Sequence, residues 1–166
     1  MEIFENKYVK KPTECEIFEI DNFYKLVLKG GKVKKEGLKE RIMNCELLAF
    51  YKVNDIIVAI SAIKKPTKTY IKDVIQKAKL ERDYNDLKFE IGYSFTEKNF
   101  RKKGFSSELK SLLLGSIKNA KGILFSTSAI SSSQKFLETN GFKNFGIPFD
   151  GNNDTKIKYY EINLNE

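Results

Sequence analysis

The segment that decides the fold is Ile91–Ser107, IGYSFTEKNFRKKGFSS, which is followed directly by ELKSLLLGSIK. The order of residue types predicts a β-strand, a short basic loop with one glycine, and an amphipathic helix. A helix N-terminus presents backbone N–H groups that have no partner within the helix, together with the positive end of the helix dipole. The run Arg101–Lys103 adds charge there, and Gly104 lets a ligand approach the backbone closely. The segment therefore predicts a site for an anion, and we expect a diphosphate.

The spacing of this loop excludes two common nucleotide-binding patterns. The chain has no GxxxxGK[ST], and no GxGxxG opens a helix after the first strand. Arg101–Ser106, RKKGFS, instead resembles the acetyl-CoA motif of the GNAT acetyltransferase superfamily, [RQ]-x-x-G-x-[GA], with serine in the last small position.

A second resemblance to the same superfamily lies downstream, after the apolar run Gly122–Ala129. Phe136–Phe142, FLETNGF, is similar to the family's Y-E-K-x-G-F, in which a helix ends at a glycine and a strand begins at the phenylalanine. The two motifs span about Phe89 to Gly146, whereas the N-terminal half is matched only by the order of its expected elements. The resemblance implies an α/β (α+β) fold with a mixed sheet of six or seven strands, flanked by helices and splayed after the fourth strand. The length of 166 residues suits a single domain, residues 1–166.

Apolar periodicity and turn residues predict the remaining elements. Asp21 is expected to cap the first helix, Gly30 and Gly31 to end it, and Asn54-Asp55 to form a hairpin turn. The expected strands are Cys15–Ile20, Glu46–Val53, Ile56–Lys65, Lys88–Thr96, Ile123–Thr127, one starting at Phe142, and Lys156–Leu164. The expected helices are Asn22–Gly31, Glu36–Asn44, Thr67–Arg82, Ser107–Asn119 and Ser132–Asn140.

The composition is that of a globular protein, with 41% hydrophobic residues. No run approaches 18 apolar residues, and the start MEIFENKYVKK lacks the pattern of a signal peptide, so we expect a soluble cytoplasmic protein without a membrane partner. Cys15 and Cys45 form no CxxC pair and are expected to be free thiols.

The chain contains no histidine, which excludes Ser-His-Asp and Cys-His hydrolases and, with two cysteines, disfavours a metal site. The net charge of +8 favours either solubility or attraction of anions such as the phosphates of CoA. A second concentration of positive charge, Lys64–Arg82, has no role in holding CoA. It belongs either to a helix that covers the sheet edge or to one wall of an acceptor site.

The resemblance implies that acetyl-CoA is the acyl donor and that its pantetheine arm pairs with the fourth strand. A backbone N–H near Phe95 would then stabilise the oxyanion. For the base that accepts the proton of the amine we expect Glu90, with Tyr93 as a weaker alternative. Ser131 or a neighbouring serine would replace the family's asparagine before the second-motif helix. The expected cofactor-binding residues are Phe95, Thr96, Arg101, Lys102, Lys103, Gly104, Phe105, Ser106, Ser107 and Ser131.

Two departures from the family pattern leave points open. Leu137 stands where many members have the tyrosine that protonates the leaving thiolate, and Tyr159 or Tyr160 could substitute. The segment between Phe95 and Arg101 is one residue longer than usual, so the face that Glu90 occupies is undecided.

Two functions therefore remain. The first is an N-acetyltransferase that acts on a primary amine, small or macromolecular, by direct attack in a ternary complex. The second is a catalytically weak or inactive GNAT-fold module that binds CoA and a nucleic-acid or protein partner. Either a monomer or a homodimer is compatible with the sequence.

Overall fold

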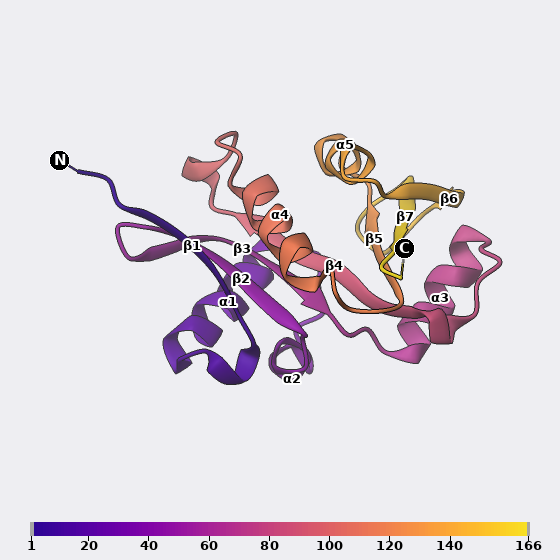
Figure 1. Ribbon diagram of the computed structural model, residues 1–166, viewed down its shortest axis with the longest axis horizontal. Helices are drawn as coiled ribbons and strands as arrows, with labels where there is room; N and C mark the ends of the chain where they lie inside the picture. Colours follow the sequence, from indigo (N-terminus) through magenta and orange to yellow (C-terminus); the bar gives the residue numbers. More distant parts are fainter. Residues whose placement is uncertain (1, 166) are drawn as a thin grey trace. The chain divides into compact units, whose positions relative to one another are not determined.

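The computed structural model describes residues 2–165 and shows an α/β architecture (Figure 1). Seven strands form one mixed sheet in the order β1-β2-β3-β4-β5-β7-β6. The strands are β1 Glu5–Lys10, β2 Leu47–Val53, β3 Ile56–Lys64, β4 Leu87–Thr96, β5 Ile123–Ser128, β6 Lys143–Phe149 and β7 Ile157–Asn163. The helices are α1 Ile17–Gly30, α2 Leu38–Met43, α3 Lys68–Ala78, α4 Phe105–Ile117 and α5 Ser131–Thr139. The sequence prediction of a mixed sheet flanked by helices is confirmed.

The chain divides into two compact units. The first unit comprises the chain up to Lys64 together with Ile91–Lys118. The second comprises Lys65–Glu90 and the chain from Asn119 onward. We describe each unit by itself, and the assignment of residues 1–166 to a single domain stays a prediction.

The β2–β3 hairpin is the centre of the first unit. Its turn residues Asn54 and Asp55 both have positive φ, 49° and 67°, as the tight turn between twisted strands requires. Seven successive residues of β3, Ile57–Ile63, are buried, as expected for a strand that lies between β2 and β4 in the sheet.

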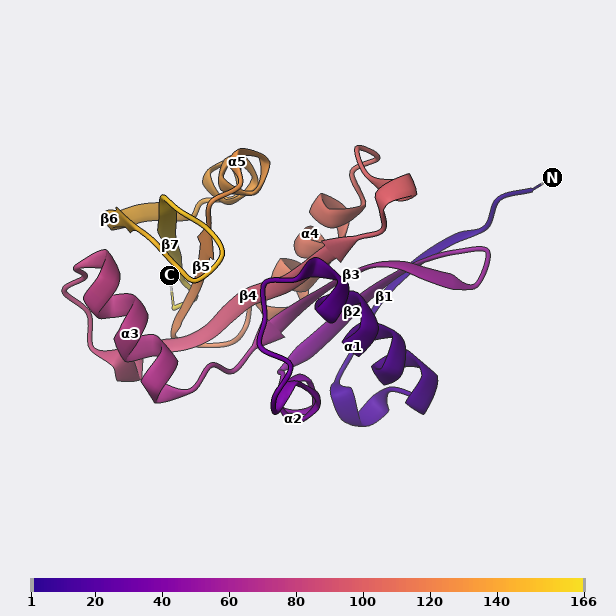
Figure 2. The ribbon, with the colours of Figure 1, turned by 180° about the vertical axis from the view of Figure 1, so that it is seen from behind.

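Helices cover both faces of the hairpin. Phe50 of β2 packs edge-on against Phe23 of α1, whereas the next residue, Tyr51, stacks on Phe105 of α4. Because neighbouring strand residues point to opposite faces, α1 and α4 lie on opposite sides of this part of the sheet. The two opposite views in Figures 1 and 2 show the same arrangement.

The predicted first strand, Cys15–Ile20, is wrong. Ile17–Ile20 form the first turn of α1, and β1 is instead Glu5–Lys10, paired antiparallel with β2. Glu19 decides the helix start, because its carboxylate accepts the backbone N–H of Glu16 at 2.8 Å in a capping box. Asp21 lies inside the helix and does not cap it. Gly31, in the left-handed conformation, caps its C-terminus as predicted.

Antiparallel pairing of β5 with β7 and of β6 with β7 builds the sheet of the second unit. The start of β4 pairs with β5 in parallel, and this described ladder ends at Glu90 opposite Phe125, as expected for a sheet that splays after its fourth strand. Helix α3 buries Ile71, Val74 and Ala78 in a cluster that includes Phe125. The predicted helix Thr67–Arg82 is therefore confirmed but shorter, because Lys79 adopts a left-handed conformation and ends it.

None of the helices in residues 2–165 combines the length and the apolar character needed to span a membrane. Both cysteines are free thiols, as predicted; Cys45 is buried and Cys15 half-buried.

The buried carboxylate of Glu19 provides a test of the first unit. It accepts hydrogen bonds from Lys10 Nζ at 2.9 and 3.1 Å and from the Tyr8 hydroxyl, and its side chain is 2% exposed. Burial alone would raise the pKa of this carboxyl, but these bonds and that from the Glu16 N–H outweigh it and lower the pKa below 4.5. Ionised Glu19 therefore contributes stability above pH 4.5, and the contribution is lost as the pH falls through the lowered folded value.

We predict that Glu19→Gln lowers the free energy of unfolding at pH 7 by about 1–3 kcal/mol, because it weakens charge-assisted bonds in a buried site. Urea unfolding measures this, with Glu40→Gln on the exposed face of α2 as the control. The difference between wild type and variant should narrow below pH 4.5. Equal stabilities at pH 7 would contradict the role assigned to Glu19.

Candidate functional site

The predicted anion loop lies between β4 and α4 in the first unit. Lys102 and Gly104 both have left-handed backbones, with φ of 62° and 82°, and α4 starts immediately after them at Phe105. The first described helical bond runs from the Glu108 N–H to the Gly104 carbonyl at 3.0 Å. Left-handed residues beside a helix start turn successive N–H groups toward one concave surface, which is the geometry of an anion nest.

The space around Gly104 is open. A Cβ placed there would meet no protein atom within 4 Å, and the basic run Arg101–Lys103 is exposed beside it. An incoming phosphate can therefore reach the backbone without displacing side chains, so the residues present fit a diphosphate.

Phe105 plays a different part from the rest of the loop. Its side chain is 5% exposed and stacks on Tyr51 with ring centroids 3.8 Å apart. The ring is therefore a core anchor, and Phe105 can contact a ligand only through its backbone. Ser106 is half-buried and Ser107 is exposed in the same first turn of α4.

Arg101 folds back onto the end of β4. Its Nε donates a hydrogen bond to the Thr96 carbonyl at 3.0 Å, and its guanidinium lies 5.6 Å from the centre of the Phe95 ring. Lys103 stands in a similar relation to Phe100, with Nζ 5.6 Å from the ring centre. Three of the predicted cofactor residues, Phe95, Thr96 and Arg101, are thus brought together.

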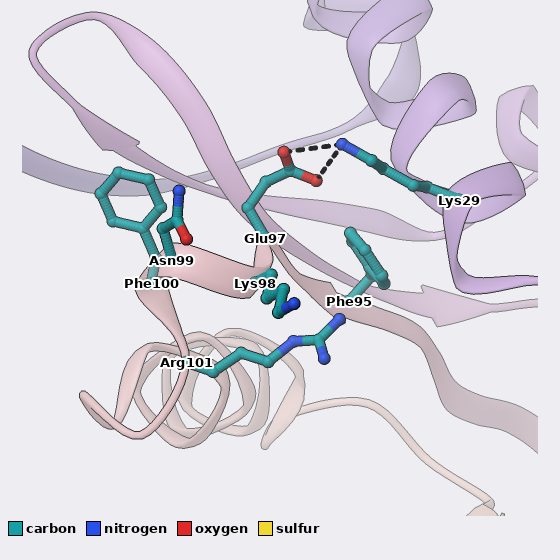
Figure 3. A pocket seen from close by; sticks show the side chains of 7 residues that line it. All are labelled: Lys29, Phe95, Glu97, Lys98, Asn99, Phe100 and Arg101. Atoms are coloured by element: carbon teal, nitrogen blue, oxygen red, sulfur yellow. Dashed lines mark hydrogen bonds and ion pairs between the residues drawn. The ribbon is translucent and has the colours of Figure 1, made fainter.

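A pocket of about 430 Å³ opens at this end of β4 (Figure 3). The Phe95 ring and the Arg101 guanidinium point toward one another, and an ion pair between Lys29 and Glu97, at 2.8 Å, lies beside them. The lining residues are Lys29, Phe95, Glu97, Lys98, Asn99, Phe100 and Arg101. Sequence reasoning missed Lys29 and Glu97, because no local pattern links the end of α1 to the end of β4.

Tyr93, the weaker candidate for the base, lies within β4 at an unusual backbone conformation. Its φ is 54°, which turns the strand locally, and the Oγ atoms of the next residue, Ser94, and Ser61 of β3 are 2.8 Å apart. The Tyr93 ring packs edge-on against Phe23, with Lys64 Nζ 4.3 Å from its centre. These contacts are those of core packing, and a catalytic role for Tyr93 stays a prediction.

Glu90, the first candidate for the base, is 3% exposed and belongs to the second unit. Its Oε2 accepts a hydrogen bond from the Tyr70 hydroxyl of α3 at 2.7 Å. Glu90 pairs with Phe125, which pairs with Glu161, so these residues share one face of the sheet. Because Phe125 packs in the cluster of α3, the structure answers the open question: Glu90 occupies the face that α3 covers.

Ser131 is the first residue of α5 and is exposed. The Ser128 hydroxyl accepts the N–H of Ile130 at 3.0 Å just before it. Ser131 lies in the second unit, and its place in the site stays a prediction.

Both phenols considered as acids for the leaving thiolate, Tyr159 and Tyr160, are buried, as is Leu137, which stands at the family's tyrosine position. The Tyr159 hydroxyl donates to Glu161 at 3.0 Å and the Tyr160 hydroxyl to Glu138 at 2.8 Å. Burial, with the Glu138 carboxylate, raises the pKa of Tyr160 to about 12, and burial, with Glu161, raises the pKa of Tyr159 further. A raised pKa makes each phenol a weaker acid.

The lysine-rich face of α3 is partly occupied by local contacts. Lys68 and Lys72 lie over the ring of Tyr84, with Nζ 5.8 and 4.4 Å from its centre, and Lys77 pairs with Asp73 at 3.0 Å. These contacts are compatible with a helix that covers the sheet. The alternative, that α3 forms one wall of an acceptor site, stays open. Among residues 2–165, no group of three or more His, Cys, Asp or Glu side chains is arranged to hold a metal ion.

Comparison with known proteins places the fold. No protein-family model and no curated protein matches the chain. Among solved structures, it is similar to an acyl-CoA N-acyltransferase from Pseudomonas aeruginosa, with a TM-score of 0.69 and 9% identity over 95% of this chain and 99% of that one. It is also similar to an acetyltransferase of the GNAT family from Bacillus cereus, with a TM-score of 0.60 and 15% identity over 95% and 97% of the two chains.

A third similar structure is yncA from Salmonella typhimurium, solved with its cofactor acetyl-CoA. The TM-score is 0.64 and the identity 12%, over 98% of this chain and 95% of that one. The chain therefore has the GNAT fold, as its two motifs predicted.

Proposed function

We propose that this protein is an N-acetyltransferase that transfers the acetyl group of acetyl-CoA to a primary amine by direct attack in a ternary complex. The observation that carries the proposal is the loop Arg101–Ser107, with its two left-handed residues and its open space at the start of α4. The fold adds support, since the similar yncA structure holds acetyl-CoA.

In this proposal, α4 holds the diphosphate of CoA through the backbone N–H groups of its first turn, Phe105–Ser107. The exposed Lys102 and Lys103 add charge that attracts the phosphates. The Lys7–Glu108 pair, at 3.0 Å, reduces the repulsion that a carboxylate in this turn would otherwise exert on an anion. Acetyl-CoA supplies an activated thioester; the chain supplies the positioning.

Strand β4 supplies the remaining groups in this proposal. Its backbone near Phe95 donates an N–H to the thioester oxygen as negative charge develops there, a contact whose loss typically costs about 2.7–4 kcal/mol. Glu90 accepts the proton of the amine. A lysine-like amine with a pKa of about 10.4 is neutral in only about one molecule per thousand at pH 7, so a base accelerates the reaction. We place the reaction in the cytoplasm, where the free thiols of Cys15 and Cys45 stay reduced.

The acceptor is tested by a screen for thiol release. Acetyl-CoA and the protein are incubated with one amine at a time: spermidine, L-lysine, kanamycin or a peptide with a free N-terminus. Release of CoA thiol with at least one amine, and the matching acetylated product in mass spectrometry, supports the proposal. Binding of acetyl-CoA without turnover on any of them favours the CoA-binding module.

The loop is tested by substituting its glycine. We predict that Gly104→Val weakens acetyl-CoA binding at least tenfold, because a branched side chain is strained at φ 82° and occupies the space that the diphosphate needs. Gly31→Val is the matched control, since Gly31 also has positive φ, 71°, and open space around it. Calorimetric titration with acetyl-CoA measures both variants. Equal affinities in the two variants would refute the assignment of the loop.

The base is tested by Glu90→Gln. We predict that turnover at pH 7 falls by roughly 10²–10⁴-fold while acetyl-CoA affinity is retained, because the amine loses its proton acceptor. The loss should shrink above about pH 10, where the amine is neutral without help. Glu138→Gln, which removes an exposed carboxylate bonded to Tyr160, is the control. Wild-type turnover in Glu90→Gln would move the role to another group.

A further inference from the structure

The proposed base does not reach the surface by itself. Glu90 is 3% exposed, whereas Tyr70, whose hydroxyl donates to Glu90 Oε2 at 2.7 Å, is 36% exposed. Tyr70 is therefore the more exposed member of this hydrogen-bonded pair.

The position of Tyr70 is fixed by its helix. Thr67 caps α3 by accepting the Tyr70 N–H at 3.3 Å, and the next residue, Ile71, is buried in the core of the second unit. A tyrosine on the first turn of a packed helix keeps its ring over one spot of the sheet. The contact with Glu90 is thus built by α3, the helix that the sequence analysis placed either over the sheet edge or in one wall of an acceptor site.

One carboxylate that faces Glu90 has hydrogen-bond partners of its own. Glu161, on the same face of the sheet, accepts a hydrogen bond from Arg82 Nε at 2.9 Å and one from the Tyr159 hydroxyl at 3.0 Å. The charge of Glu90 also contributes to the raised pKa of Tyr159, but Tyr159 is fully buried and its hydroxyl donates to Glu161. Of these two neighbouring tyrosines, Tyr70 is the one that is bonded to Glu90 and partly exposed.

We propose that Tyr70 is a catalytic residue that relays the proton of the acceptor amine to Glu90; this inference rests on the proposed function. The amine nitrogen attacks the thioester carbon, and the carbon–sulfur bond breaks with its electron pair on sulfur. The nitrogen gives its proton to the Tyr70 oxygen as the Tyr70 proton passes to Glu90 Oε2. The CoA thiolate takes a proton from solvent, and Glu90 returns its proton through Tyr70 to solvent before the next turnover.

The experiment compares Tyr70→Phe, Glu90→Gln and the double variant in the full chain. Tyr70→Phe keeps the ring and removes only the hydroxyl. Tyr8→Phe is the matched control, because it also removes a hydroxyl bonded to a buried carboxylate, that of Glu19. Turnover is measured with the best acceptor among spermidine, L-lysine, kanamycin and the peptide, from pH 7 to about pH 10, and acetyl-CoA affinity by calorimetry.

The relay predicts that Tyr70→Phe lowers turnover at pH 7 by about 10²-fold or more and leaves acetyl-CoA affinity unchanged. The loss of turnover should shrink as the pH approaches the pKa of the amine, about 10.4 for a lysine-like amine. The double variant should be no slower than Glu90→Gln, because the two residues act as one unit. A higher acceptor KM with unchanged turnover, or wild-type turnover in Tyr70→Phe beside a loss in Glu90→Gln, would overturn the relay and leave the proposed function standing.

A measurement on the wild type needs no variant. Because the relay moves two protons in one step, a plot of turnover against the deuterium fraction in mixtures of H₂O and D₂O should be curved. A straight line would overturn the relay. Absence of thiol release with all four amines would overturn the proposed function itself, and the relay with it.

Discussion

The stack of Phe105 on Tyr51 is the interaction on which the candidate site depends. With ring centroids 3.8 Å apart, the two side chains fix the residue at which α4 begins. The left-handed turn at Lys102 and Gly104 must then complete the path from β4 to that point. The loop therefore has the shape of the proposed anion site before any ligand arrives, and in our proposal binding need not be offset by the cost of ordering the backbone. An aromatic contact in the core thus determines the geometry of an exposed surface.

Burial separates the chemical groups of β4 by role. The residues near its end, Phe95 and Thr96, are half-buried beside the pocket, where backbone groups are accessible to a ligand. Glu90, earlier on the strand, is enclosed under α3 and contacts the Tyr70 hydroxyl. A chain without histidine can use carboxylates and phenols for proton transfer, and this pair provides both at 2.7 Å. Helix α3, which covers this face of the sheet, therefore also supplies a polar partner to the proposed base.

The sequence predicted those parts of the fold that have strong local patterns. The β2–β3 hairpin, the β4–loop–α4 segment and the strands after it follow from apolar runs, the Asn54-Asp55 turn and the glycine positions. The strand predicted at Cys15–Ile20 was wrong because six residues, four of them apolar, are too few to separate a strand from a helix by periodicity. The Glu16–Glu19 capping box is the feature that marks the helix start. Strand β1, ENKYVK, was missed because it is a charged strand at the edge of the sheet with few apolar residues.

The candidate site was predictable only where it is local. Arg101–Ser107 carries its own motif, so its residues could be named from the sequence. The Lys29–Glu97 pair and the Tyr70–Glu90 bond join residues far apart in the chain, and no spacing rule indicates them. Tyr70 lies at helical spacing from Ile71 and Val74, and nothing in that spacing indicates a partner for its hydroxyl.

The central claim is that the first turn of α4 holds the diphosphate of acetyl-CoA. A crystal structure of the protein grown with CoA tests it most directly. Our account predicts diphosphate oxygens within hydrogen-bond distance of backbone N–H groups of Phe105–Ser107, above the open face of Gly104. A diphosphate bound elsewhere on the protein, with this turn contacting only solvent, would contradict it.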